Sequence, residues 1–155
     1  LPFSLAAQPD KVYKSLKEVS DPMQVYHLQL HGKRLKHIPS EVYGMANLQT
    51  LDLRGNRISR ISDSIASLVH LRKLELSRNP LMEIPEAVVH LSELKELVLW
   101  STYVSALPVE SVEMDGRLEL LDLRSCPLLP DDQEAIRAQL PSVRILWDYA
   151  CNCGD

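Results

Sequence analysis

Three acidic residues recur at matching places in the chain, and their spacing is the first feature that could carry chemistry. Asp52, Glu75 and Asp122 each lie between two leucines in an L-D/E-L triplet. If the triplets form neighbouring strands, the side chains of Asp52 and Glu75 lie about 5 Å apart. That separation is compatible with the carboxylate pair of a hydrolase.

We nevertheless expect no enzyme here. Arg54, Arg72 and Lys73 are close enough in the sequence to neutralise the acidic residues, and an open sheet face provides no cleft. The G-x-G-x-x-G, P-loop and G-x-S-x-G motifs, which bind phosphate or present a nucleophile, are absent from the sequence. We therefore predict a chain with no catalysis and no cofactor.

Histidines and cysteines do not form a metal-binding pattern. His27 and His31 share one strand face, but four residues of strand separate them by about 13 Å, which is too far for one metal ion. The Cys-Asn-Cys run at residues 151–153 would need further ligands, and the sequence offers none nearby. We predict no metal site and solvated histidines at the five positions His27, His31, His37, His70 and His90.

The overall composition is that of one soluble folded domain. The chain has 155 residues, 45% of them apolar and 25% charged, with a formal net charge of −4. A mildly acidic chain without a basic stripe is a poor nucleic-acid binder. No apolar run approaches the roughly 18 residues of a membrane-spanning helix.

An internal repeat explains why the acidic residues recur. The pattern L-x-x-L-x-L-x-x-N/C-x-L occurs five times, starting at Val25, Leu48, Leu71, Leu94 and Leu118. We call these units one to five and number positions from the first residue of each. A degenerate sixth unit, VRILWDYAC, starts at Val143. Positions 4 and 6 are leucine in all five full units, and both point to one face of a strand.

These units resemble the leucine-rich-repeat family, across roughly Met23 to Cys151. The resemblance implies an α/β fold, a right-handed solenoid with a parallel sheet on the concave face and short 3₁₀ or helical turns on the convex face. The second half of each unit resembles the short repeat class of about 23 residues with an I-P-x-x-V motif, as in HIPSEVYGM and EIPEAVVHL. Pro39, Pro85 and Pro108 disfavour long helices in these segments.

The ends of the repeat array need covers. Val12, Leu16 and Val19 have helical spacing, so we predict an amphipathic helix over Lys11–Val19 within an N-terminal helical cap at residues 9–22. We predict one longer helix from about Asp132 to Gln139, because acidic residues follow Pro130. Residues 23–155 then form the repeat domain of five full units and a C-terminal capping unit.

Residues 1–8, LPFSLAAQ, resemble the end of a secretory signal peptide with cleavage after Ala7. The chain does not begin with methionine, so we expect further sequence upstream. The stretch that follows resembles leucine-rich-repeat proteins exported by Bacteroidetes bacteria, which implies a secreted or periplasmic protein. The alternative is a cytoplasmic protein in which Leu1, Phe3 and Leu5 simply pack on the cap.

Position 9 holds a column of asparagines in the family, whose buried amides bind backbone groups at the turn. The column here is Lys33, Asn56, Asn79, Thr102, Cys126 and Cys151. Lys33 indicates that the loop of unit one opens towards solvent. Cys126 and Cys151 would stack about 5 Å apart, within reach of a disulfide; three free thiols are the alternative.

Positions 3, 5 and 7 point away from the leucine core, and their character changes along the array. Units one to three are polar, whereas unit four presents Val98 and Trp100, unit five presents Leu120, and the sixth unit would add Ile145, Trp147 and Tyr149. An apolar and aromatic cluster beside arginines has the composition of a binding hot spot. The candidate partner-binding residues are Trp100, Val98, Leu120, Arg124, Tyr103, Arg54 and Arg78. Capping of the last unit is the alternative role for Trp147 and Tyr149.

The sequence thus predicts a binding module that recognises a partner protein with its concave sheet. We expect a monomer with no nucleic-acid partner and no membrane-spanning segment. A cytoplasmic scaffold or a regulatory, inhibitory subunit is the alternative function.

Overall fold

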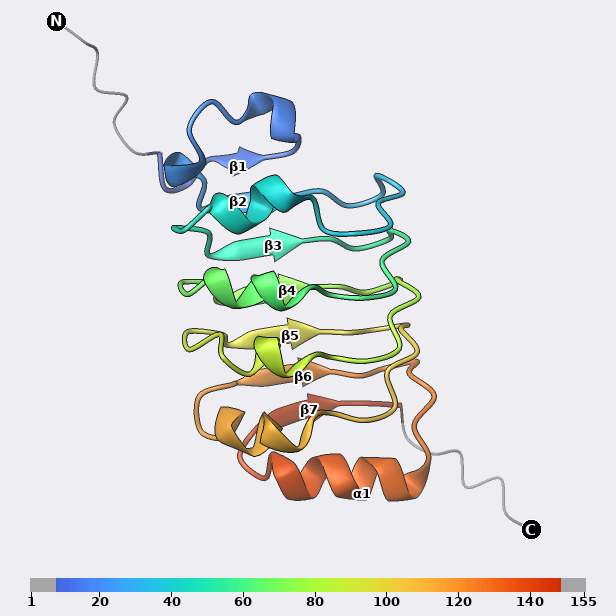
Figure 1. The fold of residues 1–155 in the computed structure, drawn as a ribbon. Coiled ribbons are helices and arrows are strands. Elements are labelled where there is room, and N and C mark those ends of the chain that lie inside the picture. The colour runs from blue at the N-terminus through green and yellow to red at the C-terminus, as the bar shows by residue number, and fades with distance from the viewer. Residues whose placement is uncertain (1–7, 149–155) are drawn as a thin grey trace, which may run out of the picture.

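The structure, a computed structural model, describes residues 8–148 and has one parallel sheet. Its seven strands lie side by side in sequence order, with one strand for each coil of the chain (Figure 1). The strands are β1 (Val12–Tyr13), β2 (His27–Gln29), β3 (Thr50–Asp52), β4 (Lys73–Glu75), β5 (Glu96–Val98), β6 (Leu120–Asp122) and β7 (Arg144–Leu146). The described helices include none with the length and apolar character needed to cross a bilayer.

The strand register follows the repeat. Leu51 of β3 pairs with Leu28 of β2 on one side and with Leu74 of β4 on the other. The central residue of each three-residue strand is buried, and its two neighbours are exposed or partly exposed in β2 to β5. The leucines at positions 4 and 6 of all five units are buried in one continuous core, which confirms the solenoid that the repeat predicts.

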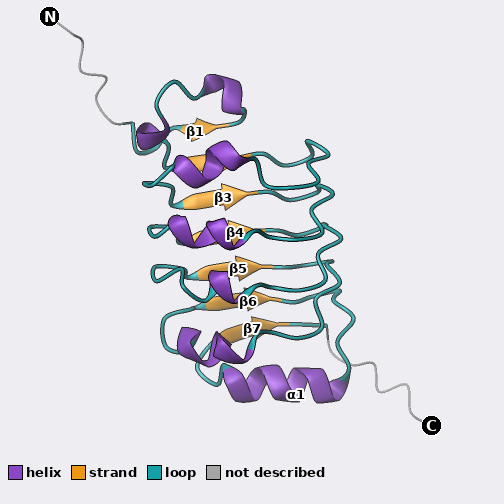
Figure 2. Cartoon of the chain, in the orientation of Figure 1, coloured by secondary structure: helices purple, strands orange, loops and turns teal. Residues whose placement is uncertain are grey.

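Short 3₁₀ turns run across the face of the coil opposite the exposed sheet face (Figure 2). A proline immediately precedes three of these turns. At this place the missing backbone N–H leaves no hydrogen bond of the turn unmade. The three residues are Pro39, Pro85 and Pro108. In unit two, Ser62 takes the same place, and its hydroxyl accepts a hydrogen bond from the N–H of Ser64 at 3.2 Å. The four turns are Ser40–Gly44, Asp63–Ser67, Glu86–Val88 and Val109–Met114.

The N-terminal segment corrects one sequence prediction. The amphipathic helix expected over Lys11–Val19, in a helical cap at residues 9–22, is wrong. The segment instead contains β1 and two 3₁₀ turns, Leu16–Glu18 and Pro22–Gln24. Tyr13 pairs with Leu28 and is buried. The helical spacing is misleading because Leu16 and Val19 do pack on the core, but from turns rather than from a helix.

The one α-helix expected near the C-terminus is present as α1 (Pro130–Gln139). It starts at Pro130, and the carboxylate of Asp132 accepts a hydrogen bond from the N–H of Leu129 at 2.8 Å. Ile136 is the buried residue of α1. The helix lies at the end of the stack of coils, where it covers the last unit (Figure 1).

The sixth unit is one residue out of the expected register. Leu121, at position 4 of unit five, pairs with Ile145 rather than with Leu146. Ile145 is therefore buried in the core and is not part of the exposed face. Trp147 packs against the core and under the guanidinium of Arg137, whose carbon lies 5.2 Å from the ring centroid. Tyr149 lies outside the described residues.

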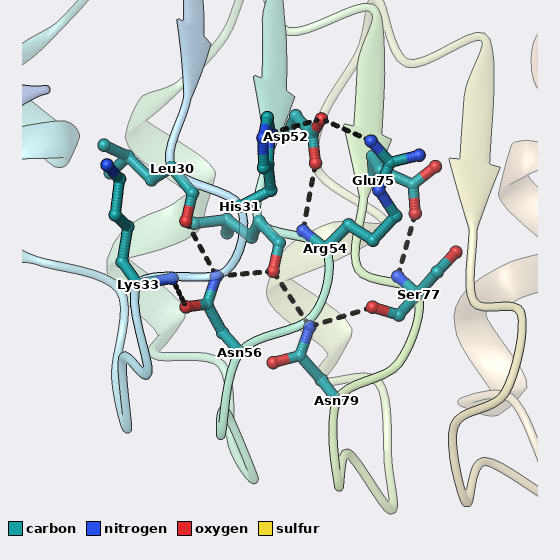
Figure 3. Close-up of polar contacts among 10 residues, drawn as sticks. Leu30, His31, Lys33, Asp52, Arg54, Asn56, Glu75, Ser77 and Asn79 are labelled. Carbon is teal, nitrogen blue, oxygen red and sulfur yellow. Dashed lines mark hydrogen bonds and ion pairs between the residues drawn. The ribbon is translucent and has the colours of Figure 1, made fainter. Parts of the chain in front are cut away.

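In the turns that follow the strands, the asparagines of position 9 bind buried backbone groups, which confirms the role predicted for them (Figure 3). The buried amide oxygen of Asn56 accepts hydrogen bonds from the N–H groups of Lys33 and Leu35, and its nitrogen donates to the carbonyls of Leu30 and Leu53. In units four and five the smaller groups Thr102 Oγ1 and Cys126 Sγ occupy the column and both contact the Leu99 carbonyl. The predicted pairing of Cys126 with Cys151 involves a residue outside the described range. Counted from Ile145 as position 4, Cys151 falls at position 10.

The turns after β2 to β6 also require a left-handed backbone at position 8. Gly32 and Gly55 meet this demand with φ of 66°, where glycine carries no steric penalty. Arg78, Ser101 and Ser125 adopt the same conformation, with φ between 55° and 57°. These three residues therefore keep side chains at a place where the backbone favours glycine.

Replacing Leu74 by alanine should lower the free energy of unfolding by about 2–5 kcal/mol, because a buried side chain leaves a cavity. The neighbouring change Glu75→Ala should cost about 0.5–1.5 kcal/mol, since it removes one hydrogen bond on the outward face. Denaturant unfolding monitored by circular dichroism measures both. Equal losses would contradict the strand register.

Asn79→Ala should also destabilise the protein, by about 1–3 kcal/mol for each backbone group left without a partner. Asn79 donates to the Leu53 and Leu76 carbonyls at 3.0 and 2.9 Å and accepts from the N–H of Ile58 at 3.0 Å. The matched control is Asn47→Ala, at a partly exposed asparagine with one bond to the Met23 carbonyl. A melting temperature that falls no further for Asn79→Ala than for this control would refute the role of the column.

Candidate functional site

The face formed by positions 3, 5 and 7 is the candidate site, and we call it the sheet face. Its polar part lies on units one to three. The carboxylates of Asp52 and Glu75 line an open hollow of about 280 Å³ on this face, a feature that the sequence analysis did not expect. They also close the turn at the end of their own strands (Figure 3). Asp52 accepts from the N–H of Arg54 at 3.0 Å, and Glu75 from the N–H of Ser77 at 2.8 Å. This pair, in register on β3 and β4, therefore has a structural task.

The neutralising partners of these carboxylates differ in part from the prediction. Arg54 Nη2 lies 3.6 Å from Asp52 Oδ2, as expected. Arg72 and Lys73 instead reach to the next coil, where they pair with Glu93 and Glu96 at 3.2 and 2.6 Å. Long side chains at the start of a strand thus connect neighbouring units rather than neighbours in sequence.

Besides Arg72, Glu93 has a histidine as its second partner. His70 Nδ1 lies 2.8 Å from Glu93 Oε1. Hydrogen bonds from His70 and Arg72 lower the pKa of the Glu93 carboxyl. His27 contacts Thr50 and His31 contacts Asp52, at 2.8 and 3.5 Å. Within residues 8–148 no three such side chains gather around a possible metal position.

The apolar part of the sheet face lies on units four and five. Val98, Trp100 and Leu120 are each partly exposed, and Tyr103 at the adjacent loop is 62% exposed. The guanidinium carbon of Arg78 lies 4.5 Å from the centroid of the Trp100 ring. The backbones of these two residues are also joined, because the N–H of Arg78 donates to the carbonyl of Trp100 at 2.9 Å. Trp100 is thus held in place from the neighbouring coil.

Arg124 borders this apolar part and is fixed by its own strand. Its Nε and Nη2 donate to the two oxygens of Asp122 at 3.0 and 2.7 Å, and its N–H donates to Asp122 Oδ1 at 3.1 Å. This bidentate bond raises the pKa of the Arg124 guanidinium. The Arg124 side chain remains 51% exposed, so its outer nitrogen and its planar face are open to a partner.

An open hollow beside Trp100 is a feature that sequence reasoning missed. It has a volume of about 540 Å³ and is lined by the turns that follow β4, β5 and β6, with Arg78, Tyr103 and Cys126 among its walls. Burial raises the pKa of the Cys126 thiol. The left-handed residues Arg78, Ser101 and Ser125 all line the hollow. The only hint in the sequence was the loss of glycine at position 8 after unit two.

Most of the predicted site residues form one neighbourhood. Trp100, Val98, Arg78 and Tyr103 belong to units three and four, and Leu120 and Arg124 lie on and just after the next strand, β6. Arg54 is separate. One full coil, with Ser77 at the equivalent position, lies between Arg54 and Trp100, so these two residues are about 10 Å apart across the strands.

Comparison with known proteins supports the architecture. Residues 24–81 match the family model described as leucine rich repeat. The fold is a leucine-rich-repeat solenoid. A leucine-rich-repeat protein from Leptospira interrogans superposes with a TM-score of 0.56 and 21% identity over 90% of this solenoid. A comparison with curated proteins gave no match.

Two further similar structures are complexes. The Toll–Spätzle complex of Drosophila gives a TM-score of 0.66 with 23% identity over 79% of this chain. The ectodomain of a plant membrane receptor kinase from Arabidopsis thaliana, in complex with Casparian strip integrity factor 2, gives 0.62 with 22% identity over 88%. This solenoid spans 46%, 18% and 20% of the Leptospira, Toll-complex and plant chains, respectively. Likeness at these identities establishes the fold alone.

Proposed function

We propose that this solenoid binds a partner protein through the apolar part of its sheet face. The observation that carries the proposal is Trp100, a partly exposed ring in the turn just after β5 that is held by Arg78. A large ring fixed before binding loses little conformational freedom when a partner covers it. Trp, Tyr and Arg are the side chains most enriched in binding hot spots.

The surroundings of Trp100 suit such a contact. Val98 and Leu120 add apolar surface on the same face, and Tyr103 adds a ring at the loop. Arg124 is positioned by Asp122 before any partner arrives, so its remaining donors need little ordering. The similar Toll–Spätzle structure and plant receptor kinase structure are both complexes, which is consistent with a binding role for this fold. Arg54 would contact only a partner that extends onto the polar part.

Trp100→Ala should weaken binding of the partner by about 2 kcal/mol or more, as truncation of a hot-spot residue does. The melting temperature of the Trp100→Ala variant should change little, because the ring is outside the leucine core. Pull-down from native extract, followed by calorimetry with the purified partner, measures the loss. Val112→Ala is the matched control, since Val112 is 53% exposed on a turn of the opposite face.

Trp147→Ala provides the opposite comparison, because this second tryptophan packs on the core. It should lower the melting temperature and leave partner affinity nearly unchanged. If Trp100→Ala behaves like Trp147→Ala, with lost stability and intact binding, Trp100 is a packing residue and the proposal fails.

We also propose that the protein is exported. The support is the resemblance of residues 1–8 to the end of a signal peptide. N-terminal sequencing of protein isolated from its native source should then find Gln8 as the first residue. A mature protein that retains Leu1 to Ala7 would contradict export by this route.

A further inference from the structure

The positive charges of units one and two are gathered at one edge of the solenoid, although the chain as a whole carries a net charge of −4. Residues 31–37 (HGKRLKH) and 54–60 (RGNRISR) contain no Asp or Glu. They hold six of the chain's 17 Lys and Arg residues. We call this set the basic edge; its members are Lys33, Arg34, Lys36, Arg54, Arg57 and Arg60.

The fold places the two segments against each other. Both follow parallel neighbouring strands, β2 and β3, and leave them at the same edge of the sheet, beyond the arrowheads in Figure 1. The N–H of Gly32 donates to the Arg54 carbonyl at 2.9 Å, and the N–H of Arg57 donates to the Leu35 carbonyl at 2.7 Å. Equivalent residues therefore stack about 5 Å apart in a fixed arrangement.

Most of these charges have no partner among the described residues. All six side chains belong to exposed residues, and Arg54 alone of the six is within 4.0 Å of a described carboxylate. The opposite edge of the sheet differs, because Arg72 and Lys95 there are paired with Glu93 and Glu119 at 3.2 Å each. Unpaired like charges repel one another unless an anion neutralises them.

The basic edge is continuous with the apolar part of the sheet face. Arg78 follows β4, the next strand of the stack, and its guanidinium covers the Trp100 ring. Position 8 forces a left-handed φ of 55° on Arg78 where Gly32 and Gly55 stand in the units before. One ligand running along the stack of coils would therefore contact the basic loops first and Trp100 next.

We propose that the basic edge binds an acidic segment of the same partner protein whose apolar residues cover Trp100; this inference rests on the proposed function. Three coils span roughly 15 Å, which is the length of four or five residues of extended chain. The two basic segments contain no Phe, Tyr or Trp on which bases could stack. Carboxylates of a short peptide thus fit this edge better than a nucleic acid does.

The test uses a fluorescein-labelled octapeptide of alternating Asp and Glu, with fluorescence anisotropy as the readout. The triple variant R34Q/R57Q/R60Q should weaken its binding at least tenfold at 50 mM NaCl. Binding to the native chain should weaken between 50 and 300 mM NaCl, since exposed charges are screened by salt. The matched control K14Q/R72Q/K95Q removes the same net charge elsewhere and should change the affinity less than twofold.

Competitors decide the class of anion. A heparin oligosaccharide or a single-stranded oligonucleotide that binds more tightly than the octapeptide, and loses its affinity in the R34Q/R57Q/R60Q variant, would overturn the assignment to an acidic peptide. Equal losses in the two triple variants would overturn the basic edge as a site, because net charge alone would then explain the binding.

Binding of the partner protein to the Trp100→Ala variant and to the R34Q/R57Q/R60Q variant distinguishes this inference from the proposed function. If both Trp100→Ala and R34Q/R57Q/R60Q weaken its binding, both stand. If Trp100→Ala alone weakens it, the apolar site stands and the basic edge fails. If the triple variant alone weakens it, the proposed function fails while the basic edge remains an acidic-segment site.

Discussion

The turn at the end of each strand is the constraint on which the rest of the structure depends. The chain must leave the sheet after only three paired residues, so backbone donors and acceptors become buried without a neighbouring strand to satisfy them. Three devices solve this problem, and they occur together in units two and three. A carboxylate such as Asp52 accepts the N–H two residues later, position 8 takes a left-handed backbone, and Asn56 or Asn79 binds the interior groups.

The variable character of the outward face follows from this arrangement. The leucines and the position 9 column secure the coil from inside, so positions 3, 5 and 7 have few structural duties except at the acidic residues of position 5. That freedom allows the face to change from polar at β2 to β4 to apolar at β5 and β6 without altering the fold. Trp100 and Val98 occupy places where Arg54 and Asp52 stand two coils earlier.

Most of the architecture could be predicted because a spacing of 23 residues fixes strand, core and turn together. The two ends could not. The sequence pattern places Ile145 on the exposed face, because V-R-I-L fits the strand pattern in two registers one residue apart. A shift of one residue exchanges the two faces of the sheet, and the structure has the other register. The helix predicted for the N-terminal segment is wrong for a related reason, since three apolar residues at helical spacing also suit a short strand followed by turns.

The contacts among the candidate site residues could not be predicted from the sequence. Sequence neighbours suggested Arg72 and Lys73 as partners of Asp52 and Glu75, but a solenoid brings residues one whole coil apart into contact, and Glu93 and Glu96 are the partners instead. The net charge also hides an arrangement that only the fold reveals. A sum of −4 excludes a basic protein, yet it does not describe a surface on which acids and bases are sorted to different edges. Because every coil turns at the same place, similar residues at equivalent positions line up in rows. Two short basic segments, each unremarkable alone, thereby become one surface adjoining Trp100.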